Sequence, residues 1–337
     1  MRVAVFSAKR YDREFLEAAN TSGHQFIYLE PALDTGTAVL AAGSDAICLF
    51  VNDRADAAAI EILAGLGVRL IALRCSGFNN VDLAAARAAG IEVARVPSYS
   101  PAAVAEHGFA LLLALNRKIH RAYNRVRECN FSLEGLMGFN LQGKTLGVVG
   151  LGEIGTATAR IGHGFGMAVL GSDPDPSAEA IALGVPMVAL PDLLARSDVV
   201  TLHCPLTPTT RHMIDDRAIE RMKPGAILIN TSRGAVLDTR AVIAALKQEK
   251  LGGLGIDVYE EEASLFFEDR SDQTLADDLF ARLLTFPNVL ITGHQGFFTH
   301  EAMTRIAEVT IANLDQFAAT GRALYSALPY PASEIEA

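Results

Sequence analysis

The segment TLGVVGLGEIG, residues 145–155, joins a short apolar run to glycines at positions 150, 152 and 155. The run has the length of a buried strand, and the Ala-rich stretch that follows favours a helix. In a strand–turn–helix unit with this spacing, Gly150 makes the tight turn, Gly152 lets backbone amides approach a pyrophosphate, and Gly155 packs helix against strand. The segment therefore predicts a dinucleotide-binding fold.

Asp173 supports this prediction from the end of the next apolar run, 23 residues after Gly150. A carboxylate at that position accepts hydrogen bonds from the ribose hydroxyls and repels a 2′-phosphate. No Arg or Lys follows in the stretch from Asp173 to Pro176. We therefore expect NAD rather than NADP, with Glu153 and Ile154 among the contacts in the glycine segment.

Further strands extend in both directions from this segment. After it come apolar runs at residues 167–173, 198–203, 226–232, 252–258 and 288–292. Before it lie runs at residues 2–6, 25–29, 46–51, 69–74 and 91–96. Short β-branched strands that alternate with Ala-rich helices are typical of parallel α/β sheets. A single core stops growing at roughly 250–300 residues, so 337 residues indicate two domains. We predict two Rossmann-like or flavodoxin-like domains with parallel sheets, separated by an active-site cleft.

The domain boundaries follow from two helices. Pro97 and Pro101 interrupt the first series of strands, and Pro101 can open one long helix that continues to about residue 128. Residues 301–321 form another helical stretch, which ends in Gly. We expect a discontinuous substrate domain, residues 1–100 plus 299–337, and an NAD-binding domain, residues 101–298.

Composition excludes several classes of partner. The net charge is −10, and no Lys/Arg stripe occurs, so nucleic acid is an unfavourable partner. The densest apolar run, residues 109–115, is far shorter than the roughly twenty residues of a membrane span, and the first residues do not resemble a signal peptide. The four cysteines lack zinc-site or CxxC spacing, which favours a reduced, cytoplasmic chain with buried cysteines and no metal.

Three polar residues follow the later strands, at the sheet edge where open α/β folds bind ligands. His294 is suited to give and take the proton of a hydroxyl group near neutral pH. Glu262 would fix the tautomer of that imidazole, and Arg233 would hold a carboxylate with its planar fork of donors. Singly, each of these residues has an ordinary structural explanation, and Glu262 lies in an acidic run typical of a solvated face. Their joint placement after three strands favours catalysis.

The phrases NTSRGAVLD, GIDVYEEE, TGHQGF, GLGEIG and RCSGFNNVDL together resemble the NAD-dependent D-2-hydroxyacid dehydrogenase family, over residues 1 to about 320. Within it, FFEDRS, CLFVND and TGHQGFFT are most similar to the fermentative bacterial D-lactate dehydrogenases. The resemblance implies that Arg233 binds the substrate, that His294 is the acid/base and that Glu262 is its partner. The implied substrate contacts are Ser76, Gly77, Phe78, Tyr99 and Phe297. The implied further cofactor contacts are His203, Pro205, Thr231, Ser232 and Asp257.

The resemblance further implies NADH-dependent, reversible reduction of pyruvate to D-lactate by a homo-oligomer, a dimer or tetramer that associates largely through the NAD-binding domains and the long helix after Pro101. One methylene in an apolar pocket is worth only about 1–3 kcal/mol, so a larger 2-keto acid, hydroxypyruvate or glyoxylate remains the alternative substrate. An NADH-sensing protein similar to transcriptional corepressors is the alternative from another class. Many relatives carry Pro and Ala where this chain has Gly293 and Gly296, which leaves the pocket size open.

Overall fold

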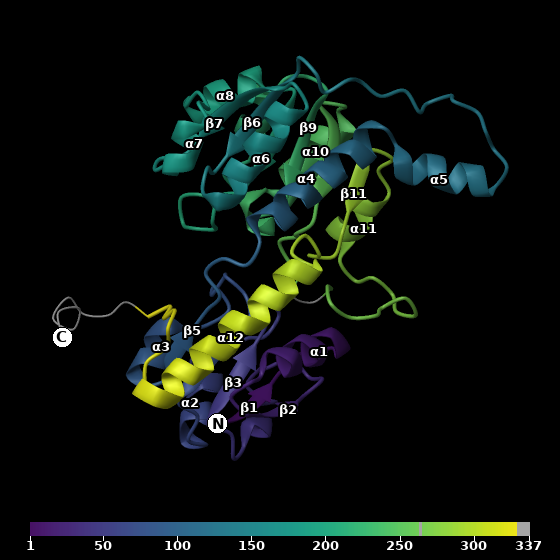
Figure 1. Ribbon diagram of the computed structural model, residues 1–337. Coiled ribbons are helices and arrows are strands. Elements are labelled where there is room, and N and C mark those ends of the chain that lie inside the picture. Colours follow the sequence, from purple (N-terminus) through teal and green to yellow (C-terminus); the bar gives the residue numbers. More distant parts are fainter. Residues whose placement is uncertain (263–264, 329–337) are drawn as a thin grey trace. The chain divides into compact units, whose positions relative to one another are not determined.

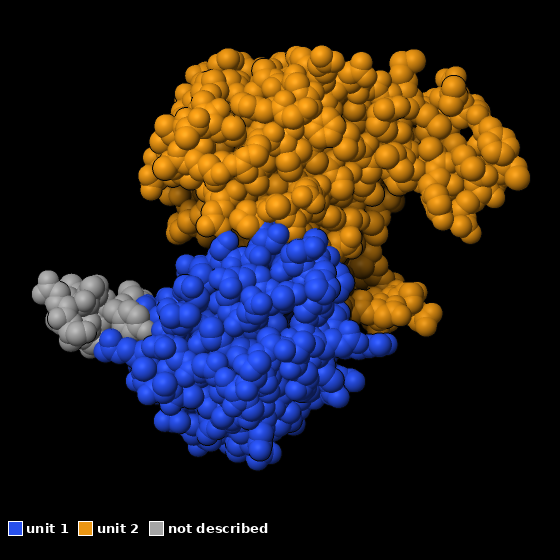
Figure 2. All heavy atoms as spheres, viewed as in Figure 1, with its two compact units in different colours: residues 1–100, 298–337 blue, residues 101–297 orange. Residues whose placement is uncertain are grey.

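The computed structural model describes residues 1–262 and 265–328. They belong to two compact units, one formed by Met1–Ser100 together with the chain from Phe298, the other by Pro101–Phe297 (Figure 2). Residues 329–337, which end the predicted substrate domain, lie outside the described part. Each unit contains one parallel sheet, which confirms the predicted fold class. Within the described ranges, no helix is both long and apolar enough to cross a membrane.

The first unit has a five-stranded sheet in the order β2-β1-β3-β4-β5 (Figure 1). Its strands are β1 (Arg2–Val5), β2 (Gln25–Tyr28), β3 (Ala46–Leu49), β4 (Leu70–Leu73) and β5 (Glu92–Ala94). Its helices are α1 (Arg10–Ala19), η1 (Ala38–Ala41), α2 (Ala57–Gly65), α3 (Leu83–Ala88) and α12 (His300–Thr320). All five strands lie in the runs predicted from the sequence.

Helix α12 joins the first unit from the far end of the sequence. The side chain of Thr299 accepts a hydrogen bond from the amide of Ala302 at its start, and Gly321 ends it with a φ of 75°. Ala307, Ile311 and Leu314 are buried in one core with strand residues of β1, β3 and β4. Their spacing of four and three residues puts them on one helical face, so α12 covers one face of this sheet.

The second unit has a six-stranded parallel sheet in the order β11-β10-β9-β8-β6-β7. Its strands are β6 (Thr145–Val149), β7 (Ala168–Ser172), β8 (Val199–Leu202), β9 (Ala226–Asn230), β10 (Leu251–Ile256) and β11 (Val289–Ile291). Its helices are α4 (Pro101–Asn116), α5 (Ile119–Arg127), α6 (Glu153–Gly164), α7 (Ala178–Ala182), α8 (Leu190–Arg196), α9 (Asp216–Arg221), η2 (Gly234–Val236), α10 (Thr239–Lys247) and α11 (Asp278–Leu284). A single parallel bridge between Gly171 and Met187 extends the sheet beyond β7.

Both faces of this sheet are covered, which explains why its strands are mostly apolar. Leu146 and Val148 of β6 pack in one core with α4 and α6. Val149 of the same strand packs in another core with α8, α9, α10 and α11. Adjacent residues of a strand point to opposite faces, so β6 contributes side chains to the cores on both faces of the sheet.

The predicted long helix after Pro101 is wrong in one respect, because the chain forms two helices there. The helix α4 ends at Asn116, and Lys118 adopts a left-handed φ of 51° before α5 begins. The Asn116 side chain accepts a hydrogen bond from the amide of Phe139 and donates one to its carbonyl oxygen. This contact with a distant segment stabilises the end of α4 at Asn116.

The expectation of four buried cysteines is also wrong at one position. Cys48, Cys75 and Cys204 are buried, and each lies in a strand or two residues after one. Cys129 is exposed, with a left-handed φ of 59°, just after the end of α5. No residue of α5 is buried, so the segment that carries Cys129 has no core to bury it.

Candidate functional site

The glycine segment has the geometry that a dinucleotide needs. Gly150 has a φ of 88°, and its amide donates to the carbonyl of Ser172 at 3.0 Å. A β-carbon at Gly155 would lie 1.9 Å from the Gly150 carbonyl oxygen, whereas one at Gly152 would meet no atom within 4 Å. Gly155 therefore permits close packing of α6 on the turn, and Gly152 leaves open space beside the start of α6.

That open space lies at the positive end of a helix. Gly152 is the N-cap of the twelve-residue helix α6 and caps it with no side chain. Glu153 and Ile154 form its first turn, whose amide groups have no partner within the helix. Amides of this kind, together with the helix dipole, form a binding site for phosphate.

Asp173 lies beside the same turn, directly after β7. One carboxylate oxygen accepts a hydrogen bond from the Leu151 amide at 2.5 Å, and the other accepts one from the Asp175 amide at 2.8 Å. The two contacts fix a negative charge next to the glycine segment. This is the arrangement that favours a ribose diol over a 2′-phosphate.

Two buried polar atoms at the ends of β8 and β9 have no hydrogen-bond partner among the described residues, namely Nδ1 of His203 and Oγ1 of Thr231. His203 Nε2 lies 2.9 Å from Oγ1 of Thr201, and burial lowers the pKa of His203 to about 4. His203 is therefore neutral near pH 7. Buried polar atoms in folded proteins are nearly always satisfied, so these two fit a polar ligand such as NAD.

Pro205 and Ser232 lie on the same two loops. The carbonyl of Pro205 accepts a hydrogen bond from Thr210 Oγ1 at 2.6 Å, and Ser232 donates both its amide and its hydroxyl proton to the side chain of Asn230. The structure thus gathers the predicted cofactor residues of the second unit along the carboxyl ends of β6, β7, β8, β9 and β10, where Asp257 directly follows β10.

His294 and Glu262 form a hydrogen-bonded pair. Nδ1 of His294 lies 2.8 Å from Oε1 of Glu262, and the two side chains are only 14% and 19% exposed. The Tyr259 amide donates to the other Glu262 oxygen at 2.9 Å. An ionised carboxylate only accepts, so Nδ1 carries the proton and Nε2 remains for a substrate. The interpretation of Glu262 as part of a solvated acidic face is therefore wrong.

Arg233 lies in the neighbouring loop, after β9. Its Nη1 donates to the carbonyl of Ser232 at 2.7 Å. A β-carbon at Gly234 would lie 2.0 Å from the carbonyl carbon of Tyr259, so the backbones of the two loops touch. The structure thereby brings the loop of Arg233 against the turn that carries Glu262.

Asn230, to which the sequence alone gave no role, holds the backbone of the Arg233 loop by hydrogen bonds. It is fully buried, and its Nδ2 donates to the carbonyl of Arg233 while its Oδ1 accepts from Ser232. A buried asparagine that ends a strand directly before a polar loop is the signal that could have found it, because such side chains bond to nearby backbone.

The remaining predicted substrate residues lie in both units. The ring of Phe297 is 6.5 Å from that of His294, in an edge-on arrangement. Ser76, Gly77 and Phe78 follow β4 in the first unit, where Arg95 donates to the Ser76 carbonyl at 3.3 Å and lies over the Phe78 ring. Tyr99 follows β5 in that unit. Their contacts with substrate stay predictions.

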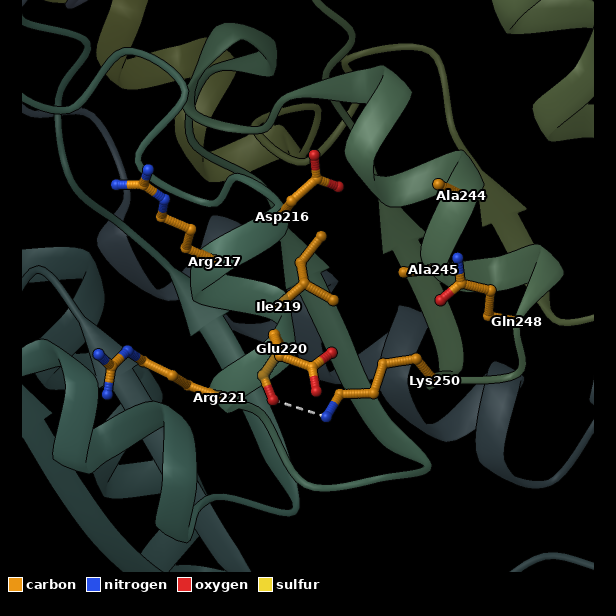
Figure 3. Close-up of a pocket in the computed structure, with 9 residues that line it drawn as sticks. All are labelled: Asp216, Arg217, Ile219, Glu220, Arg221, Ala244, Ala245, Gln248 and Lys250. Atoms are coloured by element: carbon orange, nitrogen blue, oxygen red, sulfur yellow. Dashed lines mark hydrogen bonds between the residues drawn. The ribbon is translucent and has the colours of Figure 1, made fainter.

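A separate surface pocket lies between α9 and α10, with a volume of 610 Å³ (Figure 3). Lys250 crosses one side of it and donates from Nζ to the carbonyl of Glu220 at 2.7 Å. Lys250 directly precedes β10, so the pocket lies at the amino ends of the strands, opposite the edge that carries His294. Across the described ranges, no cluster of His, Cys, Asp and Glu could hold a metal ion.

The known proteins that are similar to this chain are dehydrogenases of the kind that the residues at this sheet edge predict. Residues 109–296 match the family described as D-isomer specific 2-hydroxyacid dehydrogenase, NAD binding domain. The D-lactate dehydrogenase of Escherichia coli K12 is 52% identical over 315 residues, which cover 93% of this chain and 96% of that protein. The apo-structure of D-lactate dehydrogenase from Escherichia coli has a TM-score of 0.88 at 48% identity, over 97% of this chain and 100% of that one. D-lactate dehydrogenase from Aquifex aeolicus, solved with NAD and lactic acid, has a TM-score of 0.86 at 32% identity, over 98% and 100% of the chains. As its motifs predicted, the chain belongs to the D-isomer specific 2-hydroxyacid dehydrogenase family.

Proposed function

We propose that this protein is a D-lactate dehydrogenase, which reduces pyruvate to D-lactate with NADH and also catalyses the reverse reaction. The observation that carries the proposal is the pair of His294 and Glu262, 2.8 Å apart, on the sheet edge that also presents Arg233 and the glycine segment. The relatives named D-lactate dehydrogenase support the choice of substrate.

The second unit has the donors and the space that NAD requires. We assign the pyrophosphate to the amides beside Gly152 and the ribose diol to Asp173. His203 Nδ1 and Thr231 Oγ1 are the buried atoms that the bound cofactor would satisfy. When bound, the nicotinamide group of NADH supplies the hydride that reduces the carbonyl carbon.

Three side chains of this protein transfer the proton and bind the substrate carboxylate. His294 donates a proton from Nε2 to the substrate oxygen during reduction and takes it back during oxidation. Glu262 accepts the hydrogen bond from Nδ1 and stabilises the imidazolium ion. Arg233 binds the carboxylate, since its guanidinium group offers paired donors to two oxygens.

Replacement of His294 by Ala tests this assignment of roles. General acid catalysis contributes roughly 100- to 10,000-fold in rate, so kcat for pyruvate reduction should fall by that order while the Kd for NADH stays unchanged. A variant that retains the wild-type kcat would remove His294 from the mechanism. A wild-type protein that binds NADH but turns over no 2-keto acid would instead favour an NADH-sensing protein.

The substrate is tested by comparing kcat/KM for pyruvate, 2-ketoisocaproate, hydroxypyruvate and glyoxylate, with the chirality of the product determined. As the family resemblance implies, we also propose Ser76, Gly77 and Phe78 as contacts of the substrate carboxylate, and Tyr99 and Phe297 as contacts of its small side chain. Aromatic rings there would leave room for a methyl group. A preference for any other acid of the panel would keep the catalytic residues and reject the lactate assignment.

We also propose that the protein is a homo-oligomer that associates through the arm formed by α5 and residues 128–142. The side chains of Tyr123, Phe131, Leu133 and Met137 are 60%, 71%, 83% and 87% exposed. Apolar exposure of this extent on one segment is typical of an interface. The double variant Leu133→Asp/Met137→Asp should therefore lower the mass measured by light scattering, and an unchanged oligomer would reject the arm as the interface.

A cytoplasmic location is proposed from the cysteines. All four are free thiols, as is usual in a reducing compartment. Cell fractionation would test it, and recovery of the protein outside the cytoplasm would reject it.

A further inference from the structure

Asp257 holds three successive backbone amides of the loop that carries His294. The amides of His294, Gln295 and Gly296 donate to the carbonyl, Oδ1 and Oδ2 of Asp257 at 2.7, 2.9 and 2.7 Å. His294 has a φ of 53°, in the left-handed region that a residue with a β-carbon seldom adopts. Such a conformation persists only where surrounding contacts impose it, and here Asp257 supplies those contacts.

His107 lies in α4, a helix distant in the sequence, and contacts the residues around Asp257. Its Nε2 lies 2.9 Å from Oγ1 of Thr292 and 3.3 Å from Oδ1 of Asp257. A β-carbon at Gly296 would lie 3.3 Å from the imidazole ring of His107 and 3.0 Å from Asp257 Oδ2. His107 therefore contacts Thr292 before the loop and lies against Gly296 within it.

The direction of these hydrogen bonds follows from which of the atoms carry a proton. Thr292 Oγ1 donates its only proton to Asp257 Oδ1 at 2.5 Å. His107 Nε2 must then be the donor toward Thr292 and Asp257, because both oxygens that it faces can only accept. Burial raises the pKa of Asp257, but hydrogen bonds from His107, Thr292 and Gln295 outweigh it and hold that pKa below its ordinary value. The carboxylate is thus a buried negative charge, 3% exposed, and His107 is one of its few donors.

We propose that His107 is a positioning residue for the acid/base His294, on which it acts through Asp257 and Thr292. The inference rests on the proposed function, since it assigns His294 the proton transfer. Without the His107 donor, Asp257 is less well satisfied, the loop loosens, and His294 Nε2 no longer meets the substrate oxygen at the required distance. The side chain of His107 itself takes no part in the chemistry.

The test compares His107→Ala with His107→Gln and Thr292→Val. Glutamine can still donate a hydrogen bond toward Asp257, whereas alanine cannot, and valine removes the intervening hydroxyl with little change of shape. A misplacement of about 1 Å can cost about 100-fold in rate. We therefore expect kcat for pyruvate reduction to fall about 10- to 100-fold in His107→Ala and Thr292→Val, with NADH affinity retained and most of the activity restored in His107→Gln. His163→Ala is the matched control, because it removes an exposed histidine of the same unit.

Hydrogen exchange provides a readout that does not depend on turnover. The amides of Gln295 and Gly296 should exchange faster in His107→Ala than in the wild type, and His163→Ala should leave them unchanged. Unchanged exchange at both amides, or wild-type kcat in His107→Ala, would overturn the proposal. Equal losses in the Ala and Gln variants, together with weaker NADH binding, would overturn it in favour of a general structural role. If the wild type reduces no 2-keto acid, the proposed function fails, and the exchange rates alone decide whether His107 positions the loop.

Discussion

A methyl group added at Gly155 should mainly lower stability, whereas one added at Gly152 should mainly weaken cofactor binding. At Gly155 the new β-carbon would lie 1.9 Å from the Gly150 carbonyl oxygen, short of ordinary contact at 3.4 Å by about 1.5 Å. The obstacle is backbone, so α6 must move away from the turn. Overpacking costs about 1–3 kcal/mol and occasionally more, and we expect Gly155→Ala to lower the free energy of unfolding by about 3 kcal/mol.

At Gly152 no atom lies within 4 Å of the added methyl group, and the residue has an ordinary φ of −68°. The loss of a favourable N-cap should cost about 1 kcal/mol or less. The methyl group would, however, occupy the space through which the amides reach the pyrophosphate. We therefore expect the Kd for NADH to rise about tenfold or more in Gly152→Ala, which corresponds to about 1.4 kcal/mol.

The assays are urea unfolding followed by circular dichroism and NADH titration followed by fluorescence. Gly164→Ala is the control, because it adds the same methyl group to the last residue of α6, where no atom lies within 4 Å. Alanine in place of glycine within a helix stabilises by about 0.5–1 kcal/mol, so this variant should bind NADH normally and unfold no earlier than the wild type. Wild-type stability of Gly155→Ala, or wild-type NADH affinity of Gly152→Ala, would refute the assignment of the two glycines.

Three further outcomes follow from the same sheet edge. Asp173→Asn removes the negative charge beside the glycine segment. Since one charge contact is worth about 1 to 4 kcal/mol, the ratio of kcat/KM for NADPH to that for NADH should rise about tenfold. An unchanged ratio would contradict the role of Asp173. Glu262→Gln keeps an oxygen near His294 but removes the charge that stabilises the imidazolium ion. The value of kcat should therefore fall about 10- to 100-fold with little change in NADH affinity. A wild-type rate would argue against a catalytic role for the pair of His294 and Glu262. Burial lowers the pKa of His203 from 6.5 to about 4, so between those pH values the unfolded chain binds a proton that the folded protein does not, and the free energy of unfolding falls as the pH drops. His203→Asn should reduce that fall by about 1–3 kcal/mol in urea unfolding series at pH 7 and pH 4; the same fall in both proteins would show that His203 is not buried as a neutral group.

Local patterns were sufficient to predict most of the architecture. Each β-strand coincides with an apolar run, because strands covered on both faces are apolar along most of their length. The glycine segment could be interpreted because its turn, open space and close packing each depend on residues within one strand–turn–helix unit. His294, Glu262 and Arg233 could be nominated because parallel strands bring their carboxyl ends to one sheet edge.

The failures of prediction concern contacts between distant segments. Residues 109–117, directly before Lys118, contain neither Pro nor Gly, and α4 ends at Asn116 through the contact of that residue with Phe139. The exposure of Cys129 depends on the lack of a core beneath α5. Neither feature has a signature in the adjacent sequence.

By itself, the sequence determined two parallel α/β sheets, and it predicted a dinucleotide site after the first strand of the second sheet and the residues that we propose for proton transfer and carboxylate binding. These features depend on residues that are close together in the chain, so their spacing expresses them directly. Only the tertiary structure decided that Asp257 holds the loop of His294 and that His107 supports Asp257, since His107 and Thr292 are 185 residues apart. Hydrogen bonds between such residues depend on how helices pack against a sheet, and that packing is set by the whole core rather than by any local pattern.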